Sequence, residues 1–315
     1  MNEKTPLIRL AKREDMPKSK VWLIRAAAFL LAIVLGGLVF FIAGTNPITA
    51  YGAILSSSLG KASGIKQVVK IAVPLLGTAL ALAPCFAMRF WNIGGEGQIT
   101  MGAVAASFFA LNYAGSIPSP LLLLLMGIFS ILFGAAWAAI PASFKARWGT
   151  NETLFTLMMN YIAIGIVGWL QGGPWEGKPG SQIIPMFDQA AVLPKVFGVH
   201  CGWIIILLLT AGMYIYMNYT KQGYEIAVLG ESENTARYAG MNVAKVTIRT
   251  ACLSGGICGL IGFMVCSGTN MTLYADVAGG VGFTAIVVAW LAQFNPFAMI
   301  AISLLLAVLE KGAGG

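Results

Sequence analysis

The sequence predicts an all-α protein, a polytopic transmembrane helix bundle. Of its 315 residues, 58% are hydrophobic and only 10% are charged, and the mean hydropathy is +0.80. Soluble domains carry about 25% charged residues, so the charge content excludes that class. The apolar residues also gather in long runs separated by short polar segments, which is typical of membrane-spanning helices.

Nine apolar runs are predicted to span the membrane. The first, residues 21–43, follows a basic N-terminal segment, residues 1–21. At 1.5 Å per residue it can cross a hydrocarbon core of about 30 Å, and it is too long for the apolar region of a signal peptide. We therefore expect a retained span within one transmembrane domain, residues 22–315. The other runs are residues 71–88, 99–113, 121–140, 153–170, 202–218, 251–267, 280–292 and 297–309.

The basic residues orient these spans. With the N-terminus in the cytoplasm, 14 of the 20 Lys and Arg residues fall on the cytoplasmic side and six on the other, as the positive-inside rule requires. Residues 221–249 are then the largest cytoplasmic connection, and the proline-rich residues 171–200 are the longest external loop. We also expect residues 44–70 to lie outside, in part along the membrane interface.

The composition excludes several kinds of site. The formal charge of +8 could indicate nucleic acid, but Lys and Arg lie between apolar runs rather than among aromatic residues on one polar face, so no such partner is expected. Five cysteines form no CxxC pair and the chain has one histidine, which predicts neither a metal site nor a disulfide. A GxxxxGK match at residues 172–178 lacks the Ser or Thr of a nucleotide-binding loop. We predict no cofactor and no catalytic residue.

A polar, glycine-rich segment interrupts the apolar sequence at residues 90–102, FWNIGGEGQITMG. It places Asn92, Glu96 and Gln98 between two predicted spans, with Arg89 close enough to neutralise Glu96. Two interpretations remain open. The segment is either a short cytoplasmic turn or a broken helix whose polar side chains line a solute path, since an ionisable residue at membrane depth is a candidate for function.

The fifth predicted span starts with capping residues and carries a polar face. Asn151 is a suitable N-cap, and Glu152 in the first turn complements the helix dipole. Thr153, Thr156 and Asn160 recur at steps of three and four residues, so they share one face. In a membrane, such a face either makes hydrogen bonds to a neighbouring helix or lines a polar pathway.

The segment at residues 223–249 is longer than a simple connection requires. Ser232 can cap a short helix with Glu233 in its first turn, and small residues give that helix a face suited to a groove on a cytoplasmic partner. The residues expected to make this contact are Glu231, Glu233, Ala236, Arg237, Tyr238 and Gly240. The alternative is a helix at the membrane interface without a partner.

Four segments carry a resemblance to a known family. They read NIGGEGQ at residues 92–98, TNETLFTLMMNYIA at 150–163, GESENTARYAGMNV at 230–243 and GGVGFTAIVVAWLAQFNP at 279–296. Together and in this order, they resemble the permease subunits of bacterial ABC importers in the branched-chain amino acid and simple-sugar permease superfamily. The NIGxEGQ motif with the TxMxNY run is most similar to the nucleoside permeases that work with basic-membrane-protein-type lipoproteins.

This resemblance implies a type II-like ABC importer permease of the bacterial plasma membrane, which releases a nucleoside inward by alternating access. It implies three protein partners: a cytoplasmic ATP-binding subunit, a second homologous permease and an extracellular solute-binding lipoprotein. Residues 230–243 would be the coupling helix that sits in a groove of the ATPase, and residues 92–98 would lie on the solute path. The permease itself would catalyse no bond chemistry.

The predicted span count departs from the family pattern. Such permeases have about ten spans, whereas nine are predicted here, and the last, residues 297–309, would extend only about 20 Å as a helix. Either the chain is truncated or the count is off by one. A simple-sugar permease and an ion-coupled secondary carrier remain as alternatives, although the carrier would leave residues 223–249 unexplained. A membrane-embedded enzyme would need paired acids at membrane depth, where Glu96 is the one strong candidate.

Overall fold

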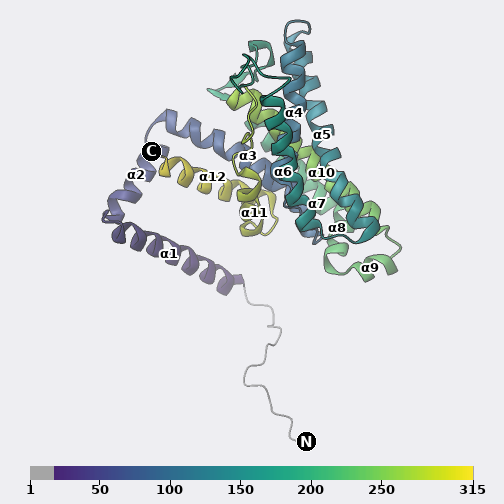
Figure 1. The fold of residues 1–315 in the computed structure, drawn as a ribbon. Coiled ribbons are helices and arrows are strands. Elements are labelled where there is room, and N and C mark those ends of the chain that lie inside the picture. Colours follow the sequence, from purple (N-terminus) through teal and green to yellow (C-terminus); the bar gives the residue numbers. More distant parts are fainter. Residues whose placement is uncertain (1–17, 315) are drawn as a thin grey trace, which may run out of the picture.

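The computed structural model describes residues 18–314, which form a bundle of helices with one small hairpin (Figure 1). The predicted all-α fold class is confirmed. Of the basic segment predicted at residues 1–21, residues 1–17 lie outside the described part of the chain.

The elements follow one another in this order. The α-helices are α1 (Lys18–Ile42), α2 (Pro47–Leu59), α3 (Ala62–Ala87), α4 (Gly95–Tyr113), α5 (Ser119–Trp148), α6 (Glu152–Gln171), α7 (Gly202–Tyr219), α8 (Lys221–Glu231), α9 (Glu233–Tyr238), α10 (Val243–Met264), α11 (Val281–Leu291) and α12 (Pro296–Ala313). Between α6 and α7 lie a 3₁₀ helix, η1 (Gln189–Ala191), and the antiparallel strands β1 (Lys195–Val196) and β2 (Val199–His200). A π-helix, η2 (Val265–Asn270), continues α10.

Six helices of the described chain are long and apolar enough to cross a membrane: α3, α5, α6, α7, the continuous α10–η2 segment and α12. The α1–α2 pair, bent by 109° at a short break, would make a seventh if it counts as one span. The sequence predicts nine. The runs predicted at residues 99–113 and 280–292 do form helices, but α4 opens with the polar sequence GEGQ and α11 has only 11 residues, about 16 Å.

The last helix, α12, is longer than the sequence predicts. It starts at Pro296, where the Asn295 side chain caps the first turn, and it continues through Glu310 and Lys311. Its 18 residues extend about 27 Å rather than about 20 Å. The charged residues do not stop the helix, because glutamate and lysine are good helix formers.

The centre of the bundle rests on close contacts between α4, α5 and α10. Gly102 of α4, Gly134 of α5 and Gly259 of α10 meet where a Cβ atom on any of them would overlap backbone atoms of a neighbouring helix. Ser130 of α5 donates a hydrogen bond to the carbonyl oxygen of Gly102 at 2.8 Å. Small residues allow this close approach, which gives membrane helices their packing energy.

The helices α1 and α2 form an arm beside the bundle (Figure 1). The Tyr51 hydroxyl in α2 donates to the carbonyl oxygen of Ile33 in α1 at 2.7 Å. Ser58 joins α2 to the bundle by donating to the carbonyl oxygen of Val308 in α12 at 2.8 Å. Many large apolar side chains of α1 are exposed, which fits a helix surrounded by lipid.

The two ends of the bundle differ in character. The hairpin end carries η1, β1 and β2, and the α9 end carries α8 and α9 (Figure 1). At the hairpin end, the backbone N–H of Phe187 donates to the carbonyl oxygen of Met271 at 2.8 Å, and that of Leu193 donates to Ser267 at 3.1 Å. The long loop predicted between the fifth and sixth spans is therefore tied to η2 and the residue that follows it.

His200 in β2 is buried at the hairpin end, with 2% of its surface exposed. Neither ring nitrogen has a hydrogen-bond partner within the described residues, and Gly202 and Gly268 lie against the ring. Burial, with a smaller effect from the charge of Lys70, lowers the pKa of His200 from its ordinary 6.5 to about 4. The fold therefore favours the neutral imidazole.

We expect Gly259→Ala to lower the stability of the protein by about 1–3 kcal/mol, because the added Cβ atom would overlap the carbonyl oxygen of Ser130. Gly212→Ala in α7 is the matched control, since open space surrounds Gly212 and alanine favours a helix. The measurement is the thermal unfolding midpoint of each purified variant. A wild-type midpoint for Gly259→Ala would contradict the close packing of α5 and α10.

Acid should destabilise the protein through His200. The stability that depends on the neutral ring is fully present above pH 6.5 and is lost as the pH falls towards 4, by up to about 3 kcal/mol. The unfolding midpoint of the wild type should therefore fall more steeply with acid over this range than that of a His200→Leu variant. Parallel curves for the two proteins would contradict this account.

Candidate functional site

The polar segment between α3 and α4 is a sharp interruption of the helical chain. Because α3 ends at Ala87 and α4 starts at Gly95, residues 88–94 between them are called the break. Pro84 weakens the last turn of α3 by removing a hydrogen-bond donor. Arg89 then adopts a left-handed conformation with a φ of 62°, which is uncommon for a residue with a side chain and turns the chain out of the helix.

Asn92 and Gln98 close the break by bonding to each other. The Asn92 amide nitrogen donates to Gln98 Oε1 at 3.3 Å and to the hydroxyl of Ser254 at 3.1 Å. Its oxygen accepts from Gln98 Nε2 and from the backbone N–H of Gly94, both at 3.0 Å. Both side chains are 1% exposed. The hydrogen-bonding groups of the Asn92 side chain are therefore all engaged within the protein.

The polar face of α6 holds the break from the other side. Asn160 donates to the carbonyl oxygen of Ile93 at 2.9 Å and accepts from the backbone N–H of Gly97 at 2.8 Å. Thr156 accepts from the backbone N–H of Ile93 at 3.1 Å. Thr153, predicted on the same face, is half-buried, and its side chain takes no part in the hydrogen bonds of the described residues. Two of the three polar side chains thus connect α6 to the break.

Glu96 binds the start of α11 rather than Arg89. One carboxylate oxygen accepts from the backbone N–H of Gly280 and the other from that of Gly282, both at 2.7 Å. The expected neutralisation by Arg89 is therefore wrong. The left-handed turn leaves Arg89 exposed at the surface, whereas Glu96 lies inside the bundle with 5% of its surface exposed.

The carboxylate of Glu96 accepts hydrogen bonds from backbone N–H groups at the start of α11, which have no acceptor within that helix. The first N–H groups of a helix are unpaired, and the helix dipole favours negative charge beside them. The buried carboxylate gains charge-assisted hydrogen bonds in return. Gly280 has a φ of 77°, and a Cβ atom on Gly282 would overlap Glu96. Both positions therefore favour glycine.

A second contact joins the break to the other end of α11. The rings of Trp91 in the break and Trp290 in α11 stack with centroids 5.5 Å apart and an interplanar angle of 16°. Phe86 of α3 packs against both rings. The short helix α11 is therefore held near each of its ends by residues of the α3–α4 junction.

The break starts at the α9 end, where Arg89 is exposed, and continues into the bundle, where Asn92 is buried. Asn92 bonds to Ser254, which is near the middle of the Val243–Asn270 segment, one of the helices long enough to span a membrane. Glu96 and Gly282, near the start of α11, are also buried. This position favours a broken helix over a turn in water, and it resembles the half-helices whose ends meet at the centre of transporter folds.

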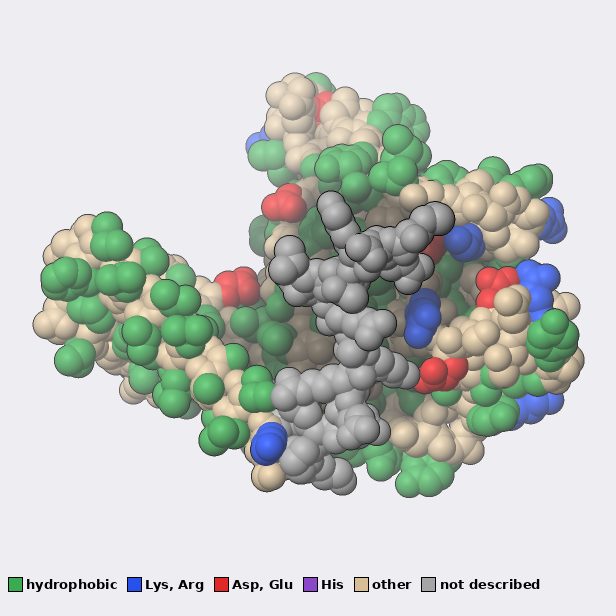
Figure 2. Space-filling model, turned by 90° about the horizontal axis from the view of Figure 1, so that it is seen from below, with side chains coloured by type: hydrophobic (Ala, Val, Ile, Leu, Met, Phe, Trp, Pro, Cys, Tyr) green, Lys and Arg blue, Asp and Glu red, His purple; other side chains and the backbone are tan. Residues whose placement is uncertain are grey.

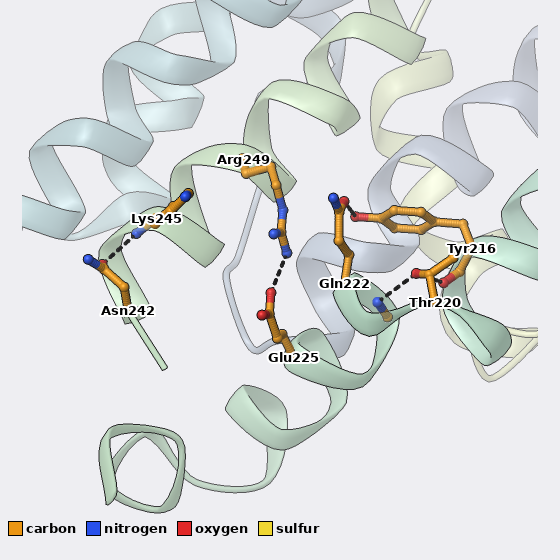
Figure 3. Close-up of polar contacts among 8 residues, drawn as sticks. Tyr216, Thr220, Gln222, Glu225, Asn242, Lys245 and Arg249 are labelled. Atoms are coloured by element: carbon orange, nitrogen blue, oxygen red, sulfur yellow. Dashed lines mark hydrogen bonds and ion pairs between the residues drawn. The ribbon is translucent and has the colours of Figure 1, made fainter. Parts of the chain in front are cut away.

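At the α9 end, a cap and an ion pair fix the chain between α7 and α10 (Figure 3). The Asn242 side chain caps α10 by accepting from the backbone N–H of Lys245 at 3.0 Å. Arg249 of α10 donates to the carboxylate of Glu225 in α8 at 2.9 Å, and both side chains are mostly buried. The ion pair joins α8 to α10.

The helix α9 faces solvent on most of its surface. Ser232 caps it by accepting from the backbone N–H of Thr235 at 3.3 Å, as the sequence predicts. Arg237 pairs with Glu233 along the helix at 2.6 Å, and Tyr238 is 93% exposed.

The residues predicted to dock on a partner divide into two groups. Five are exposed: Glu231, Glu233, Arg237, Tyr238 and Gly240. Ala236 is 1% exposed and packs in a cluster with Met88 and Phe90 of the break, so its assignment to the docking surface is corrected. A helix of six residues needs one apolar side against the bundle to remain folded, and Ala236 supplies it.

A cavity of about 770 Å³ lies between α9, the break and the α5–α6 turn. Charges of both signs line it, including Arg89, Glu231 and the ion pair of Lys145 with Glu152 at 2.9 Å. Figure 2 shows acidic and basic side chains gathered at this face. This cavity therefore separates part of α9, the expected docking helix, from the rest of the bundle.

The sequence interpretation missed the residues that bind Glu96. Gly280 and Gly282 are recognised there only as part of a glycine-rich run, and Ser254 is not singled out. A usable signal was present, because glycines directly before an apolar helix mark an N-terminus that needs an acceptor. Backbone donors are otherwise invisible in a sequence, so the partner of a buried carboxylate is hard to assign from residue types.

Known proteins resemble this chain over most of its length. The family described as "Branched-chain amino acid transport system / permease component" matches residues 64–315. The glucose ABC transporter permease protein TsgB13 of Haloferax volcanii is 30% identical over 97% of this chain and 83% of its own length. The guanosine ABC transporter permease protein NupP of Bacillus subtilis is 29% identical over 92% of this chain and 85% of its own. No solved structure matches the chain.

A third relative, the nucleoside ABC transporter permease protein NupB of Lactococcus lactis, is 27% identical over 95% of this chain and 85% of its own length. The region matched by the family includes the break, α6, α9 and α11. The chain therefore belongs to the family of branched-chain amino acid transport system permease components, and it is a permease of the ABC transporter class.

Proposed function

We propose that this permease is the membrane-spanning subunit of an ATP-driven importer, and that it carries a nucleoside inward by alternating access. The observation that carries the proposal is its similarity, over more than nine-tenths of the chain, to permeases named for guanosine and for nucleosides. ATP hydrolysis belongs to a separate subunit, since this sequence carries no complete nucleotide-binding motif.

The exposed side of α9 is the proposed contact with that ATPase. Movement of α9 reaches α10 through the Asn242 cap and through the ion pair between Arg249 and Glu225. From α10 it reaches the break, because Ser254 bonds to Asn92. A continuous set of contacts therefore supports coupling between α9 and the centre of the bundle.

Of the six residues predicted on the solute path, five have a positioning role in this proposal. Five have side chains that hold the break or α11 in place: Asn92, Glu96, Gln98, Thr156 and Asn160. Since these bonds use their polar groups, the residues set the shape of the path rather than bind the solute. Thr153, whose side chain is half-buried and outside this network, remains a candidate for direct contact.

The proposed importer needs three protein partners: the cytoplasmic ATPase, a second homologous permease and an extracellular solute-binding lipoprotein. The α9 end faces the cytoplasm of a bacterial cell, together with the N-terminus, and the hairpin end faces outside. The basic residues Arg89, Lys145 and Arg147 near the α9 end support this orientation.

Glucose is the second candidate solute, because the Haloferax volcanii glucose permease is 30% identical to this chain. The test is uptake into proteoliposomes that contain the complete transporter with ATP inside. Labelled guanosine should accumulate, and unlabelled nucleosides should compete with it. Accumulation of glucose instead would select the second candidate, and uptake driven by an ion gradient without ATP would contradict both.

Glu96→Gln should reduce uptake at unchanged expression. An amide nitrogen cannot accept a hydrogen bond, so either the N–H of Gly280 or that of Gly282 would lose its acceptor, at a cost of about 1–3 kcal/mol. Glu310→Gln, at an exposed position of α12, is the matched control and should transport like the wild type. Wild-type uptake by Glu96→Gln would show that the contact between the break region and α11 is not required for transport.

Exchanging the charges of Glu233 and Arg237 should release the ATPase from the permease. The double variant keeps an ion pair along α9 but inverts the charges offered to the partner, so we expect at least tenfold less ATPase to co-purify, with membrane insertion intact. The control exchanges Glu310 and Lys311 at the end of α12. Equal co-purification by both variants would exclude α9 as the docking element.

A further inference from the structure

The hairpin end exposes large apolar side chains that lipid does not explain. Ile183, Met186 and Phe197 are 64%, 71% and 85% exposed, and all three lie in irregular chain or at a turn. Irregular backbone is not tolerated in contact with the hydrocarbon core, because its polar groups would lack partners. These side chains therefore lie outside the hydrocarbon core, where exposed apolar clusters mark interaction sites.

Phe197 has an unusual backbone conformation for an exposed aromatic residue. Phe197 and Gly198 form the two-residue turn between β1 and β2, with φ values of 55° and 83°. Asparagine or glycine is the favoured residue at the first of these positions, and a bulky residue there is strained. The Phe197 ring centroid lies 6.5 Å from that of Trp203, but the residue remains 85% exposed. Packing within the described chain therefore covers only a small part of it.

The segment that carries these side chains is held rigidly. Ile184 and Phe187, which alternate with the exposed Ile183 and Met186, are buried. The Ser119 hydroxyl of α5 donates to the loop backbone at 2.7 Å, in addition to the two backbone hydrogen bonds with η2 and Met271. A partner that binds this loop would not have to order it, which lowers the free-energy cost of association.

Lysines outnumber acidic residues around this loop. Lys66 of α3 lies against Gly198, and Lys178 and Lys195 are also exposed. Two acids lie in the same loop, where Glu176 accepts from the backbone N–H of Gln182 at 2.6 Å and Asp188 from that of Ala190 at 2.9 Å. These three lysines therefore outnumber the acids of the loop. The surface therefore presents apolar anchors within a basic rim.

We propose that Phe197, with Ile183 and Met186 beside the exposed lysines, is the docking surface for the solute-binding protein of the transporter. The partner surface would hold an apolar socket for the Phe197 ring, rimmed by carboxylates that pair with Lys66 and Lys195. A buried aromatic anchor with a charged rim is a common arrangement of interface hot spots. This inference rests on the proposed importer function.

The test measures binding of the solute-binding protein, without its lipid anchor, to the complete transporter in nanodiscs. Phe197→Gly should weaken binding about 30-fold, the effect of losing an interface hot spot, while Phe197→Tyr should bind like the wild type. Glycine suits the left-handed turn, so the hairpin should stay folded. Gln182→Gly is the matched control, because Gln182 also has a positive φ, 51°, and is exposed in the same loop.

Equal binding by Phe197→Gly and the wild type would overturn the docking surface and leave the importer function standing. If the wild type itself bound no solute-binding protein, both proposals would fail together. A Phe197→Trp variant in nanodiscs with brominated lipids distinguishes insertion of this side chain into the bilayer from binding of the solute-binding protein. Quenching of its added fluorescence by the bilayer would overturn the proposal in favour of lipid insertion, and a change on adding the binding protein alone would support it.

Discussion

The bond between the Glu96 carboxylate and the two N–H groups at the start of α11 is the constraint on which the rest of the structure depends. A carboxylate buried among helices is costly unless hydrogen bonds stabilise its charge. The start of α11 has the opposite problem, because the first N–H groups of a helix have no acceptor within that helix. The carboxylate and the N–H groups therefore supply each other's hydrogen bonds. The hydrogen bonds of Asn92 and Asn160 hold the start of α4 in place, so that Glu96 reaches α11.

Contacts from both ends of the bundle converge on this bond. From the α9 end, the ion pair of Arg249 with Glu225 leads along α10 to Ser254 and the break. From the hairpin end, the loop is tied to η2 and to Met271, just before the segment that enters α11. Contacts among the described residues therefore lead from the α9 end to the break and from the hairpin loop to the segment that precedes α11. This arrangement is what a transporter requires if solute delivery outside and ATP hydrolysis inside are to act on one central element.

Residue types alone predict the fold class and mark the important segments, but they do not assign the partners. The polar residues at 92, 96, 98, 156 and 160 stand out because almost everything around them is apolar. Arg89 is the nearest opposite charge to Glu96 along the chain, yet backbone donors 184 and 186 residues away bind it, and such donors leave no trace in side-chain identity. The burial of Ala236 and the 11-residue length of α11 are likewise set by packing between distant segments, which a local pattern does not contain.

The most direct measurement is hydrogen–deuterium exchange of the wild-type permease in nanodiscs, read from peptides that cover residues 278–284. If Glu96 binds the start of α11, the backbone N–H groups of Gly280 and Gly282 should exchange as slowly as those in the middle of α10. Exchange as fast as that of the exposed Lys178 and Gly180, whose N–H groups have no hydrogen-bond partner among the described residues, would show that these groups are free, and it would contradict the account.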